Sequence, residues 1–347
     1  MAATIKDVAR LAGLSIATVS KYINGGHVID ANSVAIEKAI KVLDYRVNTM
    51  ARGLKTRKTK SIGVLIPSVR MVFCMDIISA IEDELSRENF STLICDCQGR
   101  PEQEAVKIEF LLEKQVDGII MMPSSNSSEA ARRASLAGVP VILVDRRFNT
   151  MDCDRVLVDN QQLAEDATTE LLQAGHKRIG IICGPEDIYT TVQRLNGYHQ
   201  AYKKAGLEAS ADCICFSDYS LEGGYKALEN LMDLTEPPTA VLATNYETTI
   251  GSVMAINRSG LKIPEDLSFV GFDSLDMSTL VTPTLTMAMQ PVQEIGEQAA
   301  KLMLRRLDPQ SSNKKSESDQ TRSDYEHIGE EIILAGKINR GASIRAL

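Results

Sequence analysis

The chain has 347 residues, 44% of them hydrophobic and 24% charged, so it can form two or three packed units and falls outside the disordered and fibrous classes. No run approaches the roughly 18 consecutive apolar residues of a membrane span. The charged N-terminal stretch lacks the apolar segment of a secretory signal, and the seven cysteines, an odd number, favour reduced thiols over a disulfide framework. We therefore expect a cytoplasmic protein without a membrane partner.

The charge is unevenly distributed along the chain. Residues 1–60 carry a net charge of +7, whereas the remainder carries −15. A small basic segment attached to an acidic body is typical of a nucleic-acid-binding module joined to a separate globular unit. A basic surface without a nucleic-acid partner remains the alternative at this point.

The first residues predict two short helices. Thr4 and Asp7 have the spacing of a helix-capping box, and Gly13 ends the helix that they begin. Ser15 is the expected N-cap of a second helix that runs to about Asn24. The buried face of the first helix is predicted by apolar residues at the helical spacing i, i+3, i+4 and i+7, namely Ile5, Val8, Ala9 and Ala12.

A third helix is predicted from about Asp30, and together the three helices indicate a helix-turn-helix. The outward face of the second helix carries small or polar residues, which allow a helix to enter the DNA major groove. Ile16 and Ala17 can contact thymine methyl groups, and Lys21 can donate to guanine. A three-helix fold without DNA is the structural alternative. The third helix is expected to bury Ile36, Ala39, Ile40 and Leu43.

The segments Thr4–Ser15 and Thr18–Asn24 closely resemble the N-terminal signature of the lactose/galactose-repressor family. Members of that family are bacterial transcription regulators that bind DNA as dimers, so the resemblance implies a homodimer on a near-palindromic operator. It also implies contacts to DNA phosphates that position the head without reading sequence. The residues expected to contact DNA in the head are Thr4, Ser15, Ile16, Ala17, Thr18, Ser20, Lys21, Asn24 and Tyr45.

The segment after the third helix resembles the hinge of the same family, a short helix that orders on DNA. In it, Asn48 matches the helix N-cap, Ala51 the close-contact residue, and Leu54 the apolar wedge that opens the minor groove. The sequence departs from the family pattern at Val47, where proline is usual. Gly53 lowers helix stability by about 1 kcal/mol relative to alanine. We expect hinge folding to cost more free energy here than in the family.

From Ser61 onward, apolar runs alternate with helical patterns such as 76–88, 102–115, 161–174 and 192–205, which indicates parallel sheets covered on both faces. The strand-like runs begin near Ile62, Ser91, Asp117, Val139, Arg178, Cys213, Thr239 and Leu267. The predicted fold is thus an all-α helix-turn-helix head plus an α/β core. The number of units favours two doubly wound lobes over a single sheet.

The resemblance implies that these lobes are periplasmic-binding-protein-like and are joined by three crossovers, with a return to the first lobe near Met289. The polar stretch 308–327 is expected to be an enlarged surface loop. The expected boundaries are 1–46 for the DNA-binding head, 47–60 for the hinge and linker, and 61–347 for the core, with lobe 1 at about 61–159 and 289–320 and lobe 2 at about 160–288 and 321–347.

A ligand site is predicted at the carboxyl ends of the strands. Two acids, a guanidinium and an aromatic ring suit a polyhydroxylated ligand. The resemblance places effector contacts at Asp145, Arg194, Tyr219, Asn245 and Asp273, with Phe73 as a weaker candidate. Because Tyr246 and the segment Met71–Cys74 depart from the family pattern, a nucleobase, another metabolite or a partner protein stays open beside a sugar.

No enzyme motif is present: the sequence has no phosphate-binding glycine loop and no nucleophile elbow. The histidines are scattered, and the pairs Cys95/Cys97 and Cys213/Cys215 fit strand cores better than a zinc site. We expect neither a cofactor nor a metal. The sequence predicts a repressor controlled by a small-molecule effector. The first alternative is a ligand-binding protein that has no role on DNA. The second is an enzyme built on a binding-protein fold.

Overall fold

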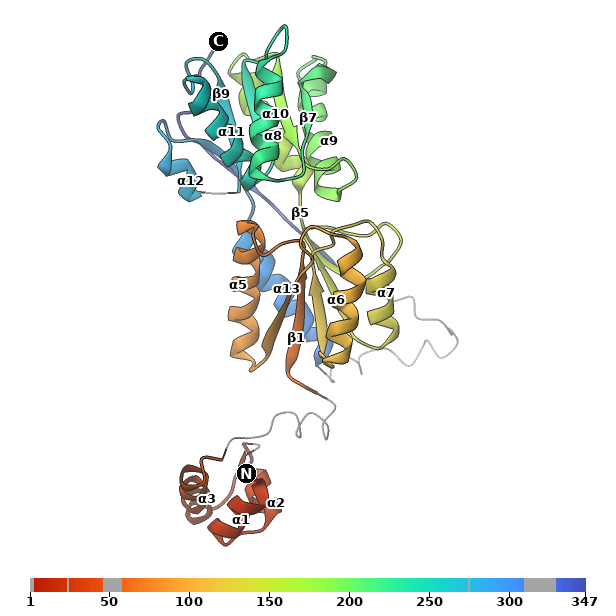
Figure 1. The fold of residues 1–347 in the computed structure, drawn as a ribbon, viewed down its shortest axis with the longest axis vertical. Coiled ribbons are helices and arrows are strands. Elements are labelled where there is room, and N and C mark those ends of the chain that lie inside the picture. Colours follow the sequence, from red (N-terminus) through yellow and green to blue (C-terminus); the bar gives the residue numbers. More distant parts are fainter. Residues whose placement is uncertain (1–2, 24, 46–57, 274, 309–328) are drawn as a thin grey trace. The chain divides into compact units, whose positions relative to one another are not determined.

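The computed structural model describes residues 3–23, 25–45, 58–273, 275–308 and 329–347. It divides the chain into a head, Met1–Thr59, and a core, Lys60–Leu347 (Figure 1). The predicted hinge contacts Asn48, Ala51 and Leu54 lie outside the described residues. The predicted loop 308–327 also lies outside them, apart from its first residue. No helix in the described part of the chain has both the length and the apolar character needed to cross a membrane.

The head consists of the three predicted helices, α1 (Ile5–Ala12), α2 (Ile16–Ile23) and α3 (Asp30–Val42). At the start of α1 the Asp7 carboxylate accepts hydrogen bonds from the Thr4 backbone N–H, at 3.0 Å, and from its hydroxyl, at 2.7 Å. Gly13 adopts the left-handed backbone conformation, with φ of 68°, and ends the helix. The three helices pack on a small core of Val8, Ala9, Val19, Ile36 and Ala39.

The first lobe of the core contains a six-stranded sheet in the order β11-β5-β4-β3-β1-β2. All its recorded strand pairs are parallel, as the continuous apolar runs predict. Helices α5 and α13 pack on one face, and α6 and α7 cover the other (Figure 1). The elements are β1 (Ser61–Ile66), α5 (Val72–Arg87), β2 (Ser91–Asp96), α6 (Glu102–Glu113), β3 (Gly118–Met121), α7 (Glu129–Leu136), β4 (Val141–Val144), β5 (Asp154–Val158), α13 (Val292–Leu307) and β11 (Glu331–Leu334).

The second lobe repeats this design with the sheet order β12-β10-β9-β8-β6-β7. Its edge strand β12 runs antiparallel to β10, so this sheet is not wholly parallel. Helices α8 and α9 pack on one face and α10 and α11 on the other. The elements are α8 (Asn160–Gln173), β6 (Ile179–Cys183), α9 (Tyr189–Lys204), η1 (Ala211–Cys213), β7 (Ile214–Phe216), α10 (Leu221–Met232), β8 (Ala240–Ala243), α11 (Tyr246–Ser259), β9 (Ser268–Phe272), α12 (Leu275–Leu280), β10 (Thr286–Met289) and β12 (Lys337–Asn339).

Three crossovers join the lobes, after β5, after β10 and between β11 and β12, which confirms the predicted topology. The predicted assignment of residues 321–347 to the second lobe is wrong for β11, which pairs in parallel with β5 of the first lobe. It is right for β12, which pairs with β10 of the second lobe. Ile332 and Leu334 explain the placement of β11, because both pack against the apolar core of the first lobe.

Helices α8 and α9 cross closely at Gly197. A Cβ atom at this position would lie 2.1 Å from the Gln161 carbonyl oxygen and 2.8 Å from the Glu165 backbone nitrogen. Because both are backbone atoms of a packed helix, Gly197→Ala is expected to destabilise the core by about 2–3 kcal/mol, which urea unfolding followed by circular dichroism measures. In the control Gly223→Ala, the nearest atom belongs to the exposed side chain of Asp218, which can turn away. Equal midpoints for the two variants would contradict this close-crossing argument.

Candidate functional site

The exposed face of α2 carries the three side chains predicted to read bases. Ile16, Ala17 and Lys21 are exposed, and Ile16 retains 46% of its accessible surface. Val19, between them in sequence, is fully buried in the head core. This division follows from helical periodicity, which places residues i and i+4 on one face. The helix thus offers small apolar groups and one cation to a partner.

The remaining predicted DNA contacts in the head have mixed surroundings. The Ser15 hydroxyl caps α2 by accepting from the Thr18 backbone N–H at 3.1 Å, and the two hydroxyls lie 2.8 Å apart. Thr4 is exposed, Ser20 is half-buried, and Tyr45 packs partly on the head core. Asn24 lies outside the described residues. Ser15 and Thr4 therefore have structural roles as caps in addition to any role on DNA.

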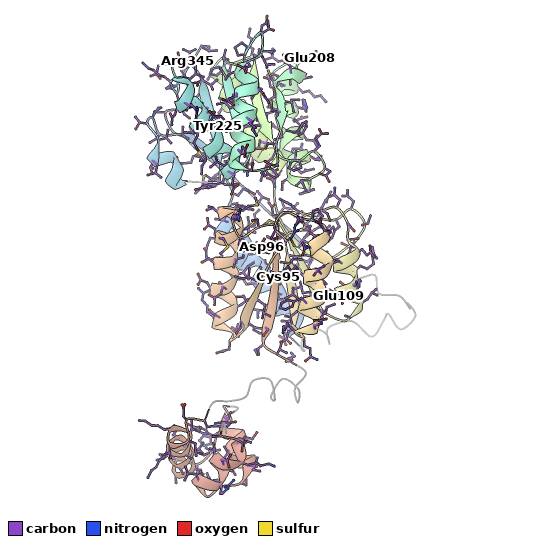
Figure 2. All side chains as sticks on the ribbon, in the orientation of Figure 1. Cys95, Asp96, Glu109, Glu208, Tyr225 and Arg345 are labelled. Atoms are coloured by element: carbon purple, nitrogen blue, oxygen red, sulfur yellow. The ribbon has the colours of Figure 1, made fainter. Side chains whose placement is uncertain are left out.

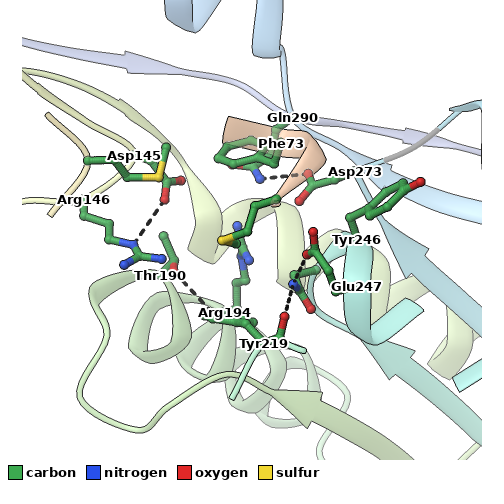
Figure 3. A pocket seen from close by; sticks show the side chains of 13 residues that line it. Phe73, Asp145, Arg146, Thr190, Arg194, Tyr219, Tyr246, Glu247, Asp273 and Gln290 are labelled. Carbon is green, nitrogen blue, oxygen red and sulfur yellow. Dashed lines mark hydrogen bonds and ion pairs between the residues drawn. The ribbon is translucent and has the colours of Figure 1, made fainter. Parts of the chain in front are cut away.

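In the core, one pocket lies between the two lobes and encloses about 330 Å³ of empty space, part of which opens to solvent (Figure 3). Its walls come from strand ends and helix starts of both sheets, where parallel α/β folds bind ligands. The pocket brings together all six residues predicted for effector contact. Its lining residues are Met71, Phe73, Met122, Asp145, Arg146, Thr190, Arg194, Tyr219, Asn245, Tyr246, Glu247, Asp273 and Gln290.

Three of the predicted residues have left-handed backbone conformations. Asp145 directly follows β4 with φ of 65°, Asp273 directly follows β9 with φ of 70°, and Tyr219 has φ of 60°. Such angles are uncommon outside glycine and cost free energy that the surrounding structure must offset. At Asp145 and Asp273, the turn directs each carboxylate into the pocket instead of along the strand (Figure 3).

Arg194, on α9, lines the base of the pocket and is fixed there by two hydrogen bonds. Its Nε donates to Asn160 Oδ1 at 2.7 Å, and its Nη1 donates to the Thr244 carbonyl at 2.5 Å. The guanidinium also lies 4.6 Å from the centre of the Phe272 ring, in cation–π geometry. With only 4% of its surface exposed, Arg194 is a fixed positive charge beneath the two aspartates.

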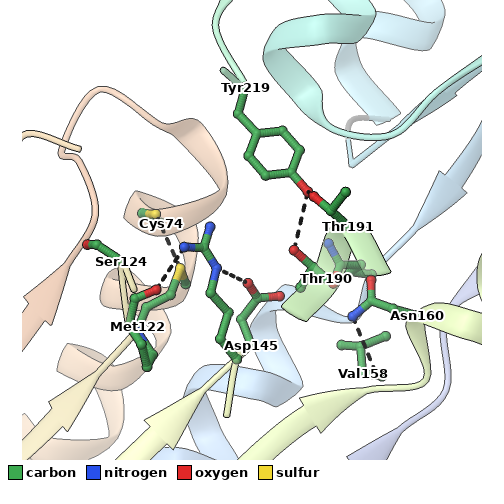
Figure 4. A network of polar contacts seen from close by, with 12 residues as sticks. Cys74, Met122, Ser124, Asp145, Val158, Asn160, Thr190, Thr191 and Tyr219 are labelled. Carbon is green, nitrogen blue, oxygen red and sulfur yellow. Dashed lines mark hydrogen bonds and ion pairs between the residues drawn. The ribbon is translucent and has the colours of Figure 1, made fainter. Parts of the chain in front are cut away.

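The Tyr219 ring is anchored by the two threonines at the start of α9. Its hydroxyl lies 2.8 Å from Thr191 Oγ1 and 3.3 Å from Thr190 Oγ1 (Figure 4). The ring occupies the space in which a side chain at Gly184 would stand, because a Cβ there would lie 2.0 Å from Tyr219 Cζ. Gly184 thus permits the strained Tyr219 conformation, and the ring forms a fixed apolar wall.

Asn245 serves mainly as the N-cap of α11. Its side-chain oxygen accepts from the Thr248 backbone N–H at 3.0 Å, and its amide donates to Glu247 Oε2 at 2.7 Å. This predicted contact residue therefore orients Glu247.

Burial raises the pKa of all three acids in the pocket. For Asp145, desolvation outweighs the opposing attraction of Arg146 and Arg194, so its pKa is raised. For Glu247, desolvation likewise exceeds the opposing effects of its own backbone N–H, the Val72 backbone N–H and the Asn245 amide, and it raises the pKa. For Asp273, desolvation raises the pKa to about 7, although Arg194 and the Gln290 amide, which donates at 2.8 Å, both lower it.

The raised pKa of Asp273 predicts a pH-dependent stability. In the folded protein Asp273 keeps its proton up to about pH 7, whereas in the unfolded chain an ordinary aspartate loses it near 3.8. The free energy of unfolding therefore falls as pH rises from about 4 to 7. Asp273→Asn removes this loss of stability, and at pH 8 the ligand-free variant should melt roughly 2–6 °C above the parent. At pH 4 the melting temperatures should coincide. The exposed Asp83→Asn controls for loss of a surface charge, and a lower melting temperature of Asp273→Asn at pH 8 would refute the assignment.

Several residues that line the pocket were not predicted from the sequence. Arg146 follows Asp145 and donates to the Pro123 carbonyl at 2.7 Å, and its Nε lies 3.5 Å from Asp145 Oδ2. Gln290 follows β10, a strand too short and mixed in character to be noticed. Glu247 lies two residues beyond the predicted Asn245. The pattern Asn-x-Glu just after a strand end could have predicted Glu247 as a pocket residue.

The described residues contain no group of three or more His, Cys, Asp or Glu that could hold a metal ion. The two cysteine pairs lie in different lobes. Cys95, labelled in Figure 2, and Cys97 belong to the core of the first lobe, whereas Cys213 and Cys215 pack in the second. His176 is fully buried, with Nδ1 2.8 Å from the Thr239 hydroxyl and Nε2 3.1 Å from the Arg345 carbonyl. Its role is to join the helix-to-strand connection to the C-terminal segment.

A helix-turn-helix head on a two-lobed binding core defines a ligand-controlled type of DNA-binding regulator. Residues 4–48 match the model of the bacterial regulatory proteins of the LacI family, and residues 59–331 match that of the periplasmic binding proteins and sugar-binding domain of the same family. The chain belongs to the LacI family and is a DNA-binding transcriptional regulator, not an enzyme.

The chain is similar to the HTH-type transcriptional repressor CytR of Escherichia coli (strain K12), with 35% identity over 310 residues, covering 89% of this chain and 91% of CytR. Its fold is similar to that of a complex of the transcriptional regulator CelR with cellobiose, with a TM-score of 0.73 and 25% identity, covering 98% and 99% of the two chains. A lac repressor dimer bound to operator matches with a TM-score of 0.85 over the full length of both chains, at 22% identity, which shows the shared fold.

Proposed function

We propose that this protein is a cytoplasmic, homodimeric repressor whose affinity for a near-palindromic operator is controlled by a sugar or sugar derivative bound between the core lobes. The observation that carries the ligand site is the meeting of two aspartates, an arginine and an aromatic ring in one pocket. A sugar is supported by the description of the matching core family and by the cellobiose complex of the similar regulator CelR. A nucleobase is the second ligand candidate.

For the head, we propose that Ile16, Ala17 and Lys21 contact bases in the major groove. The head side chains proposed to contact phosphate or to position the head are Thr4, Ser15, Thr18, Ser20, Asn24 and Tyr45. In the hinge, we propose Asn48 as the helix N-cap, Ala51 as the close-contact residue and Leu54 as the wedge in the minor groove. A dimer follows from the two-fold symmetry that a palindromic site requires. Ligand binding controls the operator if the ligand binds the DNA-bound and DNA-free states of the core with different affinities.

The deciding experiment selects duplexes from a random pool with the full-length protein at a fixed, stated salt concentration. We expect a near-palindrome whose recovery is lost with Lys21→Ala and retained with Lys38→Ala, which removes an exposed charge from α3. A sugar panel is then added to the complex with the selected duplex, and operator affinity is measured by fluorescence anisotropy. If no sequence is enriched, either with or without sugars and nucleobases, the proposal that the protein binds a specific operator is refuted.

A further inference from the structure

The inter-lobe pocket is lined by more acidic than basic side chains. Its lining contains three carboxylates, Asp145, Glu247 and Asp273, but only two guanidinium groups, Arg146 and Arg194. The single ion pair recorded among these five residues joins Arg146 to Asp145, whereas Glu247 and Asp273 have amide partners. When the acids are ionised, the pocket carries a net charge of −1.

The unused hydrogen-bonding atoms of the pocket show the same asymmetry. Asp145 Oδ1, Glu247 Oε1 and Gln290 Oε1 are buried and have no hydrogen-bond partner among the described residues, and each of these atoms accepts hydrogen bonds. Among the fully buried side-chain atoms of the lining that lack a hydrogen-bond partner in the described residues, one is a donor, Arg146 Nε, and it faces Asp145. Asp145 and Gln290 are only 3% and 4% exposed, so their unpaired oxygens need hydrogen-bond donors, which a ligand in the pocket can supply.

An ammonium group meets both requirements. It offers three donors and no acceptor, whereas a hydroxyl brings one donor and two lone pairs that require donors in return. Its single positive charge also neutralises the pocket, and buried charges are stable only when paired. The pocket lies between the two lobes and part of its space opens to solvent, so a compact ligand can enter it.

We propose that the pocket selects a compact ligand with one cationic nitrogen, with a hexosamine as the sugar of this class, and that Glu247 is the residue that determines this selectivity. This inference rests on the proposed function, because it assigns a ligand class to the same pocket. Asn245 holds Oε2 of Glu247 and leaves Oε1 for the ligand. Asp145 and Gln290 accept from the other donors of the ligand.

The test compares matched ligands on the full-length protein at pH 7.5 by thermal shift and titration calorimetry. The probes are glucosamine, galactosamine and mannosamine, each beside its parent hexose and its N-acetyl derivative, with ethanolamine as a bare ammonium and cytidine and adenosine as uncharged nucleosides. At least one hexosamine is expected to bind about 10-fold more tightly than its hexose and its N-acetyl form, because a charge-assisted hydrogen bond is stronger than a neutral one.

The variant Glu247→Gln keeps the shape of the side chain and is expected to reduce the preference for the hexosamine over its hexose by about 10-fold. Its control, Glu265→Gln, removes an exposed carboxylate of the same lobe and should leave the preference unchanged. The inference is overturned if no hexosamine binds, if a neutral sugar or nucleoside binds as tightly as every hexosamine, or if Glu247→Gln retains the preference.

Measuring operator affinity with the same probes separates this inference from the proposed function. A neutral hexose that binds and changes operator affinity would overturn the cationic ligand and leave the sugar-controlled repressor in place. A hexosamine that binds with the stated preference but leaves operator affinity unchanged would establish the pocket selectivity and count against the proposed control of DNA binding.

Discussion

Replacing Ala17 with glutamate is expected to weaken operator binding by at least ~100-fold, about 3 kcal/mol. Ala17 is exposed on α2, next to Ile16 and one turn before Lys21. A longer, negatively charged side chain at this position fills the space through which the helix backbone approaches the bases, and it places a charge against the phosphates. Because Ala17 lies outside the head core, the fold of the head should survive.

The measurement is fluorescence anisotropy with the selected operator duplex at constant salt, with circular dichroism to show that the head remains helical. Val34→Glu is the matched control, since it adds the same charge to an apolar residue on α3 that is 65% exposed. Both variants share the long-range repulsion from DNA, so the difference between them isolates the contact in the groove. Similar losses for the two variants would show that α2 does not read the bases.

Replacing Arg194 with alanine is expected to destabilise the core by about 3 kcal/mol and to abolish ligand binding. The change leaves Asn160 Oδ1 and the Thr244 carbonyl without their donors and empties the space beside the Phe272 ring. It also removes the charge that lowers the pKa of Asp145 and Asp273, so both acids should protonate at higher pH. The ligand then loses two ionised carboxylate partners, and the pocket loses the side chain that holds Asn160 and the Thr244 carbonyl in place.

Urea unfolding gives the stability change, and calorimetry with the best hexosamine or hexose gives the loss of binding. Lys203→Ala removes an exposed cation from the same helix and should change stability by no more than about 0.5 kcal/mol. Asn160→Ala separates the two effects, because it leaves the guanidinium in place while removing one of its partners. A fully stable Arg194→Ala variant would contradict the role of this residue as the floor of the pocket.

Much of the fold was predictable because the determining interactions are local. In the head, the cap formed by Thr4 and Asp7, the stop at Gly13 and the apolar spacing of each helix act within a few residues. In the core, long apolar runs marked eight of the twelve strands that the structure describes. The four that were missed, β5, β10, β11 and β12, adjoin the lobe crossovers and mix apolar with charged or polar residues.

Caps, helical periodicity and strand ends depend on neighbouring residues, so the helix-turn-helix head, the two-lobed α/β core and the strand-end residues Asp145 and Asp273 could be predicted from the sequence. The place of β11 in the first sheet could not be predicted, since strand pairing joins residues such as Ile332 and Val156 that are far apart in the chain. The same is true of the place of Glu247 and Gln290 in the pocket. Their role depends on burial and on the charges around them, and these arise only when strand ends from both lobes meet.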